Sequence, residues 1–245
     1  MAVEIFNRVE KKYRLSDEIY HCFLERLSPY MVEDKFCKND KFYLISNLYF
    51  DTWDDVLIRR SIEHPVYKEK LRLRSYGVPD LKDKVFLEIK KKYKGIVNKR
   101  RTVLRLEEAY EFLFDGKVPK EREYTNYQVI KELEYSLKLY EPVPKLYLAY
   151  DRKALHGKDD KELRITFDKN IRCRREALRL EAGDAGERLI DKDTWIMEIK
   201  TLGSMPVWLA DLLTEFDIYN QSFSKYGTEY LQYLEQEKKE KQYVE

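Results

Sequence analysis

The sequence of 245 residues has little of what a disulfide framework, a zinc centre or a membrane span requires. Its three cysteines, Cys22, Cys37 and Cys173, are widely spaced and form no CxxC pair, which argues against the first two. No apolar run approaches the length of a membrane-spanning helix, and the first residues lack the apolar core of a signal peptide. We therefore expect a cytoplasmic protein without a membrane span of its own.

The common signatures of phosphate-binding and hydrolytic enzymes are also missing. The sequence contains no GxxxxGK[ST] loop, no kinase glycine-rich loop, no GxSxG and no HExxH. Aromatic signatures of RNA-binding strands are not evident, so no nucleic-acid partner is expected. The sequence has 47 Lys and Arg and 45 Asp and Glu, so the net charge is only +2. Any anion-binding site must therefore be a local concentration of positive charge.

Such a concentration lies between Lys68 and Arg105, where fourteen Lys and Arg accompany only four Asp and Glu. A strand is predicted at 66–76, and its period of two places four of these cations on one face. They are Lys68, Lys70, Arg72 and Arg74. Like charges side by side repel, so either water or an anion must cover this face. A solvated face normally mixes both signs, which favours the anion.

A second pattern places a carboxylate two residues before a cation, on the same face of a predicted strand. The three pairs are Glu10 with Lys12, Glu88 with Lys90, and Glu198 with Lys200. A carboxylate on a cationic surface suits a hard divalent ion, because Mg²⁺ and Mn²⁺ prefer oxygen ligands and often bridge phosphates. The alternative is a cross-strand salt bridge that only dilutes the positive charge.

Predicted strands dominate the chain and mostly follow one another directly, which favours an antiparallel sheet or barrel with flanking helices, of the α+β class. We expect a single domain over 1–245 with a C-terminal helical segment at about 224–241. Strands are expected at 4–13, 42–52, 66–76, 85–92, 96–106, 145–155, 162–171 and 194–201. Helices are expected at 16–27, 53–62, 107–115, 125–139 and 206–216, the first with Ser16 as N-cap. The segment 172–190 is interpreted as a hairpin or an excursion.

Nine short motifs occur in a fixed order: EKKY, NLYFDT, KLRLRSYG, FLEIKKK, NKRR, YDRKAL, ELRITFD, IMEIKT and FSKYGTEY. Together they resemble the polyphosphate polymerase domain of the vacuolar transporter chaperone (VTC) family, within the CYTH-like triphosphate tunnel metalloenzyme superfamily. The resemblance covers about residues 4–231. YFDT followed by LRLR also suits CYTH-type triphosphatases, whereas the ordered set that ends in FSKYG favours the VTC branch.

The resemblance implies an antiparallel β-barrel tunnel that binds triphosphate, and with the strand pattern it indicates the site residues. The catalytic cations would be Lys12, Arg72, Arg74, Lys90, Arg152, Arg164 and Lys225. Substrate would also contact Lys70, Lys99, Arg101, Tyr150, Lys200 and Ser224. The divalent metal would be held by Glu198, with Glu10 and Glu88 as further candidates. Ser222 stands where the family often has a second lysine, which removes one cation from the pattern.

The implied reaction transfers the terminal phosphate of ATP to a growing inorganic polyphosphate chain, with Mn²⁺ or Mg²⁺ as cofactor. Expected partners are ATP, polyphosphate, and triphosphate or pyrophosphate. Two alternatives remain open from the residues alone. One is an inorganic or nucleoside triphosphatase, in which Glu10 or Glu88 would activate water. The other is a polyphosphate-binding module without catalysis. We also expect a stand-alone domain, without an SPX domain before it.

Overall fold

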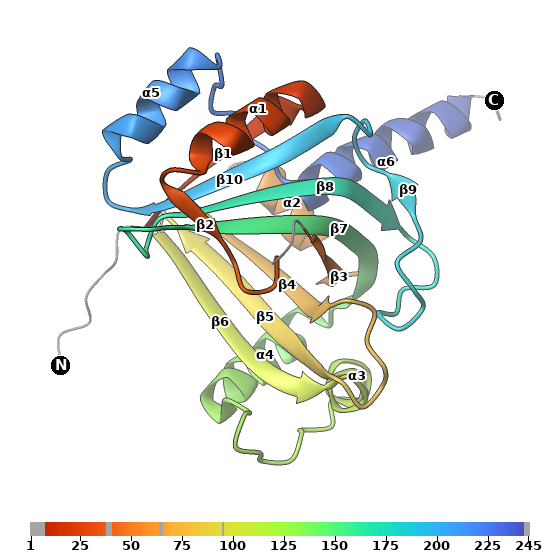
Figure 1. Cartoon of the computed structure of the whole chain (residues 1–245). Coiled ribbons are helices and arrows are strands. Elements are labelled where there is room, and N and C mark those ends of the chain that lie inside the picture. Colours follow the sequence, from red (N-terminus) through yellow and green to blue (C-terminus); the bar gives the residue numbers. More distant parts are fainter. Residues whose placement is uncertain (1–7, 38–40, 64–65, 95, 243–245) are drawn as a thin grey trace. The chain divides into compact units, whose positions relative to one another are not determined.

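The computed structural model describes residues 8–37, 41–63, 66–94 and 96–242, and its elements are labelled in Figure 1. The strands are β1 (Arg8–Ser16), β2 (Met31–Glu33), β3 (Tyr43–Asp51), β4 (Tyr67–Tyr76), β5 (Lys84–Tyr93), β6 (Ile96–Arg105), β7 (Val143–Gly157), β8 (Arg164–Arg174), β9 (Glu187–Arg188) and β10 (Thr194–Leu202). The helices are α1 (Asp17–Leu27), α2 (Val56–Ile62), α3 (Leu106–Asp115), α4 (Tyr127–Tyr140), α5 (Val207–Glu215) and α6 (Lys225–Gln242). The strands pair in the order β1-β10-β8-β7-β3-β4-β5-β6, while β2 pairs with β7 and β9 with β8. The predicted antiparallel sheet with flanking helices is confirmed.

The chain divides into two compact units. Unit 1 comprises Met1–Tyr43, Tyr150–Ile171 and Ile190–Phe223. Unit 2 comprises Leu44–Ala149, Arg172–Leu189 and Ser224–Glu245. The strands β7 and β8 contribute residues to both units. Each unit has its own hydrophobic core, so each is described by itself.

In unit 1, one face of the strands forms a core with α1 and α5. Tyr13, Ile165 and Met197 contribute from β1, β8 and β10, in the same cluster as Phe23 of α1 and Leu212 of α5. Figure 1 shows α1 lying along β10. The helix begins as predicted, because the Ser16 hydroxyl accepts a hydrogen bond of 3.2 Å from the backbone N–H of Ile19. Side chains of the opposite parity on these strands are mainly charged.

In unit 2, the strands β3 to β6 pack one face against α3 and α4, which lie together beneath β5 and β6 in Figure 1. Leu71 and Leu73 of β4, Leu87 of β5 and Leu104 of β6 are fully or almost fully buried in this core. The intervening residues of these strands point to the other face. The sequence alternation therefore fixes which side of unit 2 carries the charged residues.

Asp51, at the end of β3, links α2 and α6 within unit 2. Its carboxylate accepts backbone hydrogen bonds of 2.8 Å from Thr52, Leu57 and Ile58, and the Tyr226 hydroxyl lies 3.4 Å away. The carboxylate thus satisfies N–H groups at the start of α2 that lack a helical partner. The YFDT motif therefore has a structural role, since it anchors α2 and the first turn of α6.

Two details differ from the sequence predictions. The strand β2 was not predicted, because three residues are too few to form a pattern. The helix α2 begins at Val56 instead of Trp53, because the Thr52 hydroxyl accepts from the Val56 N–H at 2.8 Å and holds a turn before it. The segment 172–190 contains the end of β8 and the short β9 that pairs antiparallel with it, which agrees with the predicted hairpin. Residues 4–7 of the first predicted strand lie outside the described residues.

No helix in the described part of the chain has both the length and the apolar character needed to span a membrane.

Candidate functional site

The charged face of unit 2 is built by cross-strand rows on β4, β5 and β6. Arg72 lies opposite Glu88, which lies opposite Arg101. In the next row, Lys70 lies opposite Lys90, which lies opposite Lys99. We call this face the β4–β6 cluster, and it consists of Lys70, Arg72, Arg74, Glu88, Lys90, Lys99 and Arg101.

Glu88 is the one carboxylate of the β4–β6 cluster and is only 1% exposed. It accepts from Arg72 Nε at 2.8 Å, from Lys99 Nζ at 2.8 Å and from Arg101. Burial alone would raise the pKa of Glu88, but the nearby Arg72, Arg74 and Lys99 outweigh it and lower the pKa below its usual range. Glu88 therefore remains ionised and acts as a shared salt-bridge partner of the surrounding cations.

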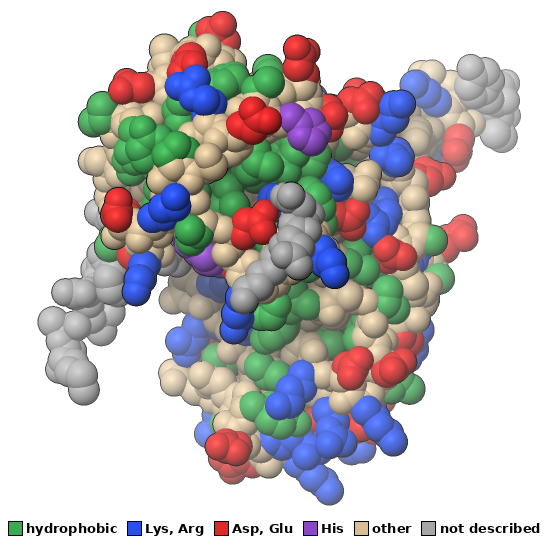
Figure 2. Space-filling model, viewed as in Figure 1, with side chains coloured by type: hydrophobic (Ala, Val, Ile, Leu, Met, Phe, Trp, Pro, Cys, Tyr) green, Lys and Arg blue, Asp and Glu red, His purple; other side chains and the backbone are tan. Residues whose placement is uncertain are grey.

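The next row consists of three lysines, of which Lys99 pairs with Glu88 at 2.8 Å. Lys70 Nζ donates to the Ser224 hydroxyl at 3.0 Å. Burial and the neighbouring Arg101 and Arg72 lower the pKa of Lys99 to about 8, although Glu88 opposes them. Like charges directly opposite one another destabilise a sheet, so an anion placed here would relieve repulsion. The molecular face drawn in Figure 2, in contrast, has the usual mixture of acidic and basic side chains.

Residues of β3 hold the two arginines of β4. Tyr49 lies opposite Arg72, and its hydroxyl accepts from Arg72 at 3.3 Å. Burial would raise the pKa of Tyr49, but Arg72, Lys70 and Arg74 outweigh it and lower the pKa to about 8. Asn47 lies opposite Arg74 in the same way. The NLY segment of β3 thus supports the RLR segment of β4.

Unit 1 carries a second group, the β1–β10–β8 cluster, which consists of Glu10, Lys12, Arg164, Thr166, Asp168, Glu198 and Lys200, with Arg152 of β7. Glu198 lies opposite Lys12 on one side and Thr166 on the other. Its carboxylate is 2.5 Å from Lys200 Nζ, and Lys200 is also 3.7 Å from Glu10. Burial would raise the pKa of Glu198, but Lys200, Arg152 and Lys12 outweigh it and hold the pKa below its usual range. Glu198 is therefore ionised.

The two arginines of this cluster have acidic partners. Arg152 makes a bidentate contact with Asp168, at 2.6 and 2.8 Å. Although burial opposes it, Asp168 raises the pKa of Arg152 well above its usual value. Arg164 donates to Asp34 at 3.4 Å, and His156 lies 3.1 Å from the same Asp34 oxygen. Arg164 is thus more weakly held than Arg152.

Comparison with known proteins identifies the family. The model of the VTC domain family matches residues 7–234, which is most of the chain. The chain belongs to the VTC domain family. Among curated protein sequences, no relative is found. Solved structures with a similar fold include a candidate adenylate cyclase from Bacillus halodurans and the candidate adenylyl cyclase HpAC1 from Hippeastrum, the latter described as having a dominant triphosphatase activity.

The likeness to these two structures concerns the fold alone. The first shares 16% sequence identity with a TM-score of 0.53, and the second 19% with a TM-score of 0.54. In each case the match covers 89% of this chain and 93% of the other. Together with the family match, they confirm the predicted triphosphate tunnel fold for this VTC domain.

Whether the VTC domain could hold a metal ion depends on which side chains are placed to coordinate it. Among the residues that the structure describes, no three His, Cys, Asp or Glu side chains gather in a metal-binding group. Glu198 and Glu10 nevertheless share Lys200 as a neighbour. Mg²⁺ is commonly bound by one or two carboxylates together with substrate phosphates. The two carboxylates are thus the candidate donors for a divalent ion, which would have to displace the Lys200 ammonium that contacts both.

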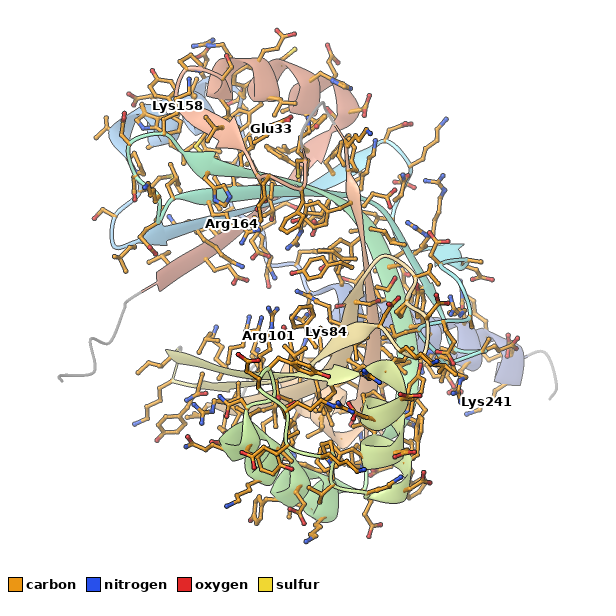
Figure 3. All side chains as sticks on the ribbon, turned by 60° about the horizontal axis from the view of Figure 1, so that its bottom comes forward. Glu33, Lys84, Arg101, Lys158, Arg164 and Lys241 are labelled. Atoms are coloured by element: carbon orange, nitrogen blue, oxygen red, sulfur yellow. The ribbon has the colours of Figure 1, made fainter. Side chains whose placement is uncertain are left out.

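The sixteen residues that the sequence indicated divide between the two units, and Figure 3 labels one from each, Arg164 and Arg101. Unit 1 contains Glu10, Lys12, Tyr150, Arg152, Arg164, Glu198 and Lys200. Unit 2 contains Lys70, Arg72, Arg74, Glu88, Lys90, Lys99, Arg101, Ser224 and Lys225. Their roles stay predictions. Sequence reasoning missed the partners Asn47, Tyr49, Asp34 and Asp168. Asn47 and Tyr49 alternate with the buried Leu48 and Phe50, and this alternation could have placed them on the charged face. Asp34 is part of no such sequence pattern.

Proposed function

We propose that this VTC domain transfers the terminal phosphoryl group of ATP to an inorganic polyphosphate chain, with Mn²⁺ or Mg²⁺ as cofactor. The observation that carries the proposal is the excess of cations around Glu88, the one carboxylate of the β4–β6 cluster. Such an excess needs an anion, and a phosphate chain supplies many charged oxygens. Membership of the VTC family supports the choice of polyphosphate.

In this proposal the protein acts by neutralising and positioning phosphate groups, since phosphoryl transfer needs little covalent help. The acceptor is itself a phosphate oxyanion, so no general base is required. Phosphate groups would be neutralised by Arg72, Arg74 and Lys90 in unit 2 and by Arg152 and Arg164 in unit 1. Lys225 in unit 2 and Lys12 in unit 1 are proposed as further phosphate-binding cations. Further contacts would come from Lys70, Lys99, Arg101, Tyr150, Lys200 and Ser224.

The metal would be held by Glu198, with Glu10 as a second carboxylate. When bound, a divalent ion neutralises phosphate oxygens and helps to orient them. The low pKa of Glu198 keeps its carboxylate ionised and available as an oxygen ligand. Glu88 is a weaker candidate, because three cationic side chains already contact its oxygens.

A triphosphatase is the second candidate function, and the description of the Hippeastrum structure as a triphosphatase favours it. Water would then replace polyphosphate as acceptor and would need a base. Glu10 is the better choice, because its contacts with Lys12 and Lys200, at 3.6 and 3.7 Å, are longer than the contacts of Glu88 with Arg72 and Lys99. A polyphosphate-binding module without catalysis is the third. The single-domain organisation and the cytoplasmic location also stay predictions.

Incubation of the purified protein with ATP and Mn²⁺ distinguishes these functions. Products are resolved by chain length on a gel, and free phosphate is measured in parallel. Polyphosphate that appears in proportion to ADP supports the polymerase. Free phosphate without longer chains would establish the triphosphatase instead. ATP that binds without turnover would leave only the binding module.

A further inference from the structure

Two buried polar atoms on β8 have no hydrogen-bond partner among the described residues: Thr166 Oγ1 and Arg164 Nε. Thr166 is only 3% exposed, so bulk water does not satisfy its hydroxyl. Buried polar groups in native proteins are nearly always paired, because an unpaired one destabilises the fold. Two such atoms, two residues apart on one strand, therefore point to a missing ligand.

Thr166 lies among the charged side chains of unit 1. Thr166 lies directly opposite Glu198, and Arg164 lies directly opposite Lys200. The two β8 residues share a face with Asp168, whereas Ile165 and Phe167 between them belong to the core of unit 1. Figure 3 shows Arg164 on the strands of unit 1. Thr166 is thus in the middle of the β1–β10–β8 cluster.

The nearest acidic groups on this face are already engaged. Both oxygens of Asp168 accept from Arg152, and Glu198 contacts Lys200 at 2.5 Å. The guanidinium Nε–H can only donate, and the threonine hydroxyl donates readily to an anion. What both atoms lack is therefore an acceptor, and a phosphate group offers several charged oxygens.

We propose that the Thr166 hydroxyl and Arg164 Nε together bind the oxygens of one phosphoryl group of the substrate, so that Thr166 is a substrate-binding residue of the site. This inference rests on the proposed function and adds to it a neutral donor beside Glu198. A bound metal ion is the poorer occupant for Thr166, since the Arg164 guanidinium, two residues away on the same strand, repels a cation. The subsite therefore recognises phosphate in the absence of metal.

The test compares the near-isosteric variant Thr166→Val with Thr166→Ser, in the full chain. Tripolyphosphate binding is measured calorimetrically without divalent metal, and melting temperatures are measured without ligand. We expect Thr166→Val to bind about tenfold more weakly, since a hydrogen bond to a charged group is lost. Its melting temperature should be unchanged or higher, because the unpaired hydroxyl is replaced by a methyl group. Thr166→Ser should bind as the wild type does.

Thr201→Val is the matched control in the same unit. Thr201 is buried in β10, but its hydroxyl donates to the Gly203 carbonyl at 3.1 Å. The control should therefore melt at a lower temperature and bind tripolyphosphate normally. If Thr166→Val binds tripolyphosphate as the wild type does, the inference is wrong and the proposed function stands. Loss of Mn²⁺ binding alone would also overturn it, because the hydroxyl would then be a metal ligand. If the wild type does not bind tripolyphosphate, the proposed function itself fails.

Discussion

Asn47 of β3 holds Arg74 of β4 through a hydrogen bond of 2.9 Å from the arginine Nε to the amide oxygen. The amide nitrogen of Asn47 donates in turn to the Leu148 carbonyl of β7, at 3.0 Å. Asn47 is fully buried, and Arg74 is only 7% exposed. A buried amide thus connects the backbone of one strand to a cation of the β4–β6 cluster, and it fixes the direction of that guanidinium.

Replacement of Asn47 by alanine should impair both stability and ligand binding. It leaves the Leu148 carbonyl and Arg74 Nε without this partner, which costs about 1–3 kcal/mol of unfolding free energy. Because Arg74 then loses a contact that orients its guanidinium, tripolyphosphate should bind about tenfold more weakly. Urea unfolding and calorimetry measure the two effects. The control is Ser46→Ala, which loses a buried hydrogen bond to Tyr147 but no contact with the cluster, and should lose stability only. Equal affinity of Asn47→Ala and wild type would contradict the positioning role.

Replacement of Glu88 by glutamine should make the protein less stable but more responsive to ligand. The substitution removes the buried charge that the partly exposed Arg72, Lys99 and Arg101 share, so it should cost less than the about 3–5 kcal/mol typical of a fully buried pair. Tripolyphosphate can then supply the missing negative charge, so its addition should raise the melting temperature more than in the wild type. Melting curves with and without tripolyphosphate measure this. A loss of Mn²⁺ binding in the variant would instead assign the metal to Glu88.

Binding of tripolyphosphate should weaken as the pH rises through about 8. Lys99 has a pKa of about 8 and loses its positive charge, while Tyr49, also with a pKa of about 8, gains a negative one. Both changes disfavour an anion, and bound anion would conversely raise both pKa values. Calorimetry from pH 7 to 9 at low ionic strength measures the effect. Lys99→Arg should reduce the pH dependence, because arginine stays charged throughout. An identical profile in this variant would show that Lys99 does not contact the anion.

Glu198→Gln should lose Mn²⁺ binding and metal-dependent turnover while it keeps the fold. Changes of groups that merely orient metal ligands cost about 10–100-fold in affinity, so loss of a ligand should cost at least as much. Mn²⁺ binding is followed by electron paramagnetic resonance. Because the pKa of Glu198 is lowered, its charge stabilises the folded state at neutral pH, and this contribution disappears as the pH falls. The stabilities of variant and wild type should therefore converge in acid. Unchanged Mn²⁺ binding would leave Glu198 as a salt-bridge partner only.

The sequence predicted most strands and helices because their alternation and caps are local signals. Leu71 and Leu73 alternate with Arg72 and Arg74, and this pattern alone places the cations on one face. The pattern could not distinguish Glu88 from Glu198, since each precedes a lysine by two residues. The difference arises from neighbouring strands, which place Arg72, Lys99 and Arg101 around Glu88. The contact of Arg164 with Asp34 was equally invisible, because it joins residues 130 positions apart.

The alternation on β4 also has a consequence for how the chain reaches its native state. If β4 slipped by one residue against β5, Arg72 and Arg74 would turn toward the hydrocarbon core that Leu71 and Leu73 now occupy. Unpaired charges in such an environment are prohibitively costly, so misregistered pairings of these strands are strongly disfavoured. The cations of the β4–β6 cluster thus favour the correct strand register during folding, before any ligand is present. Neutral replacements there would make incorrect registers less costly, and strand misalignment and aggregation would then compete with correct folding.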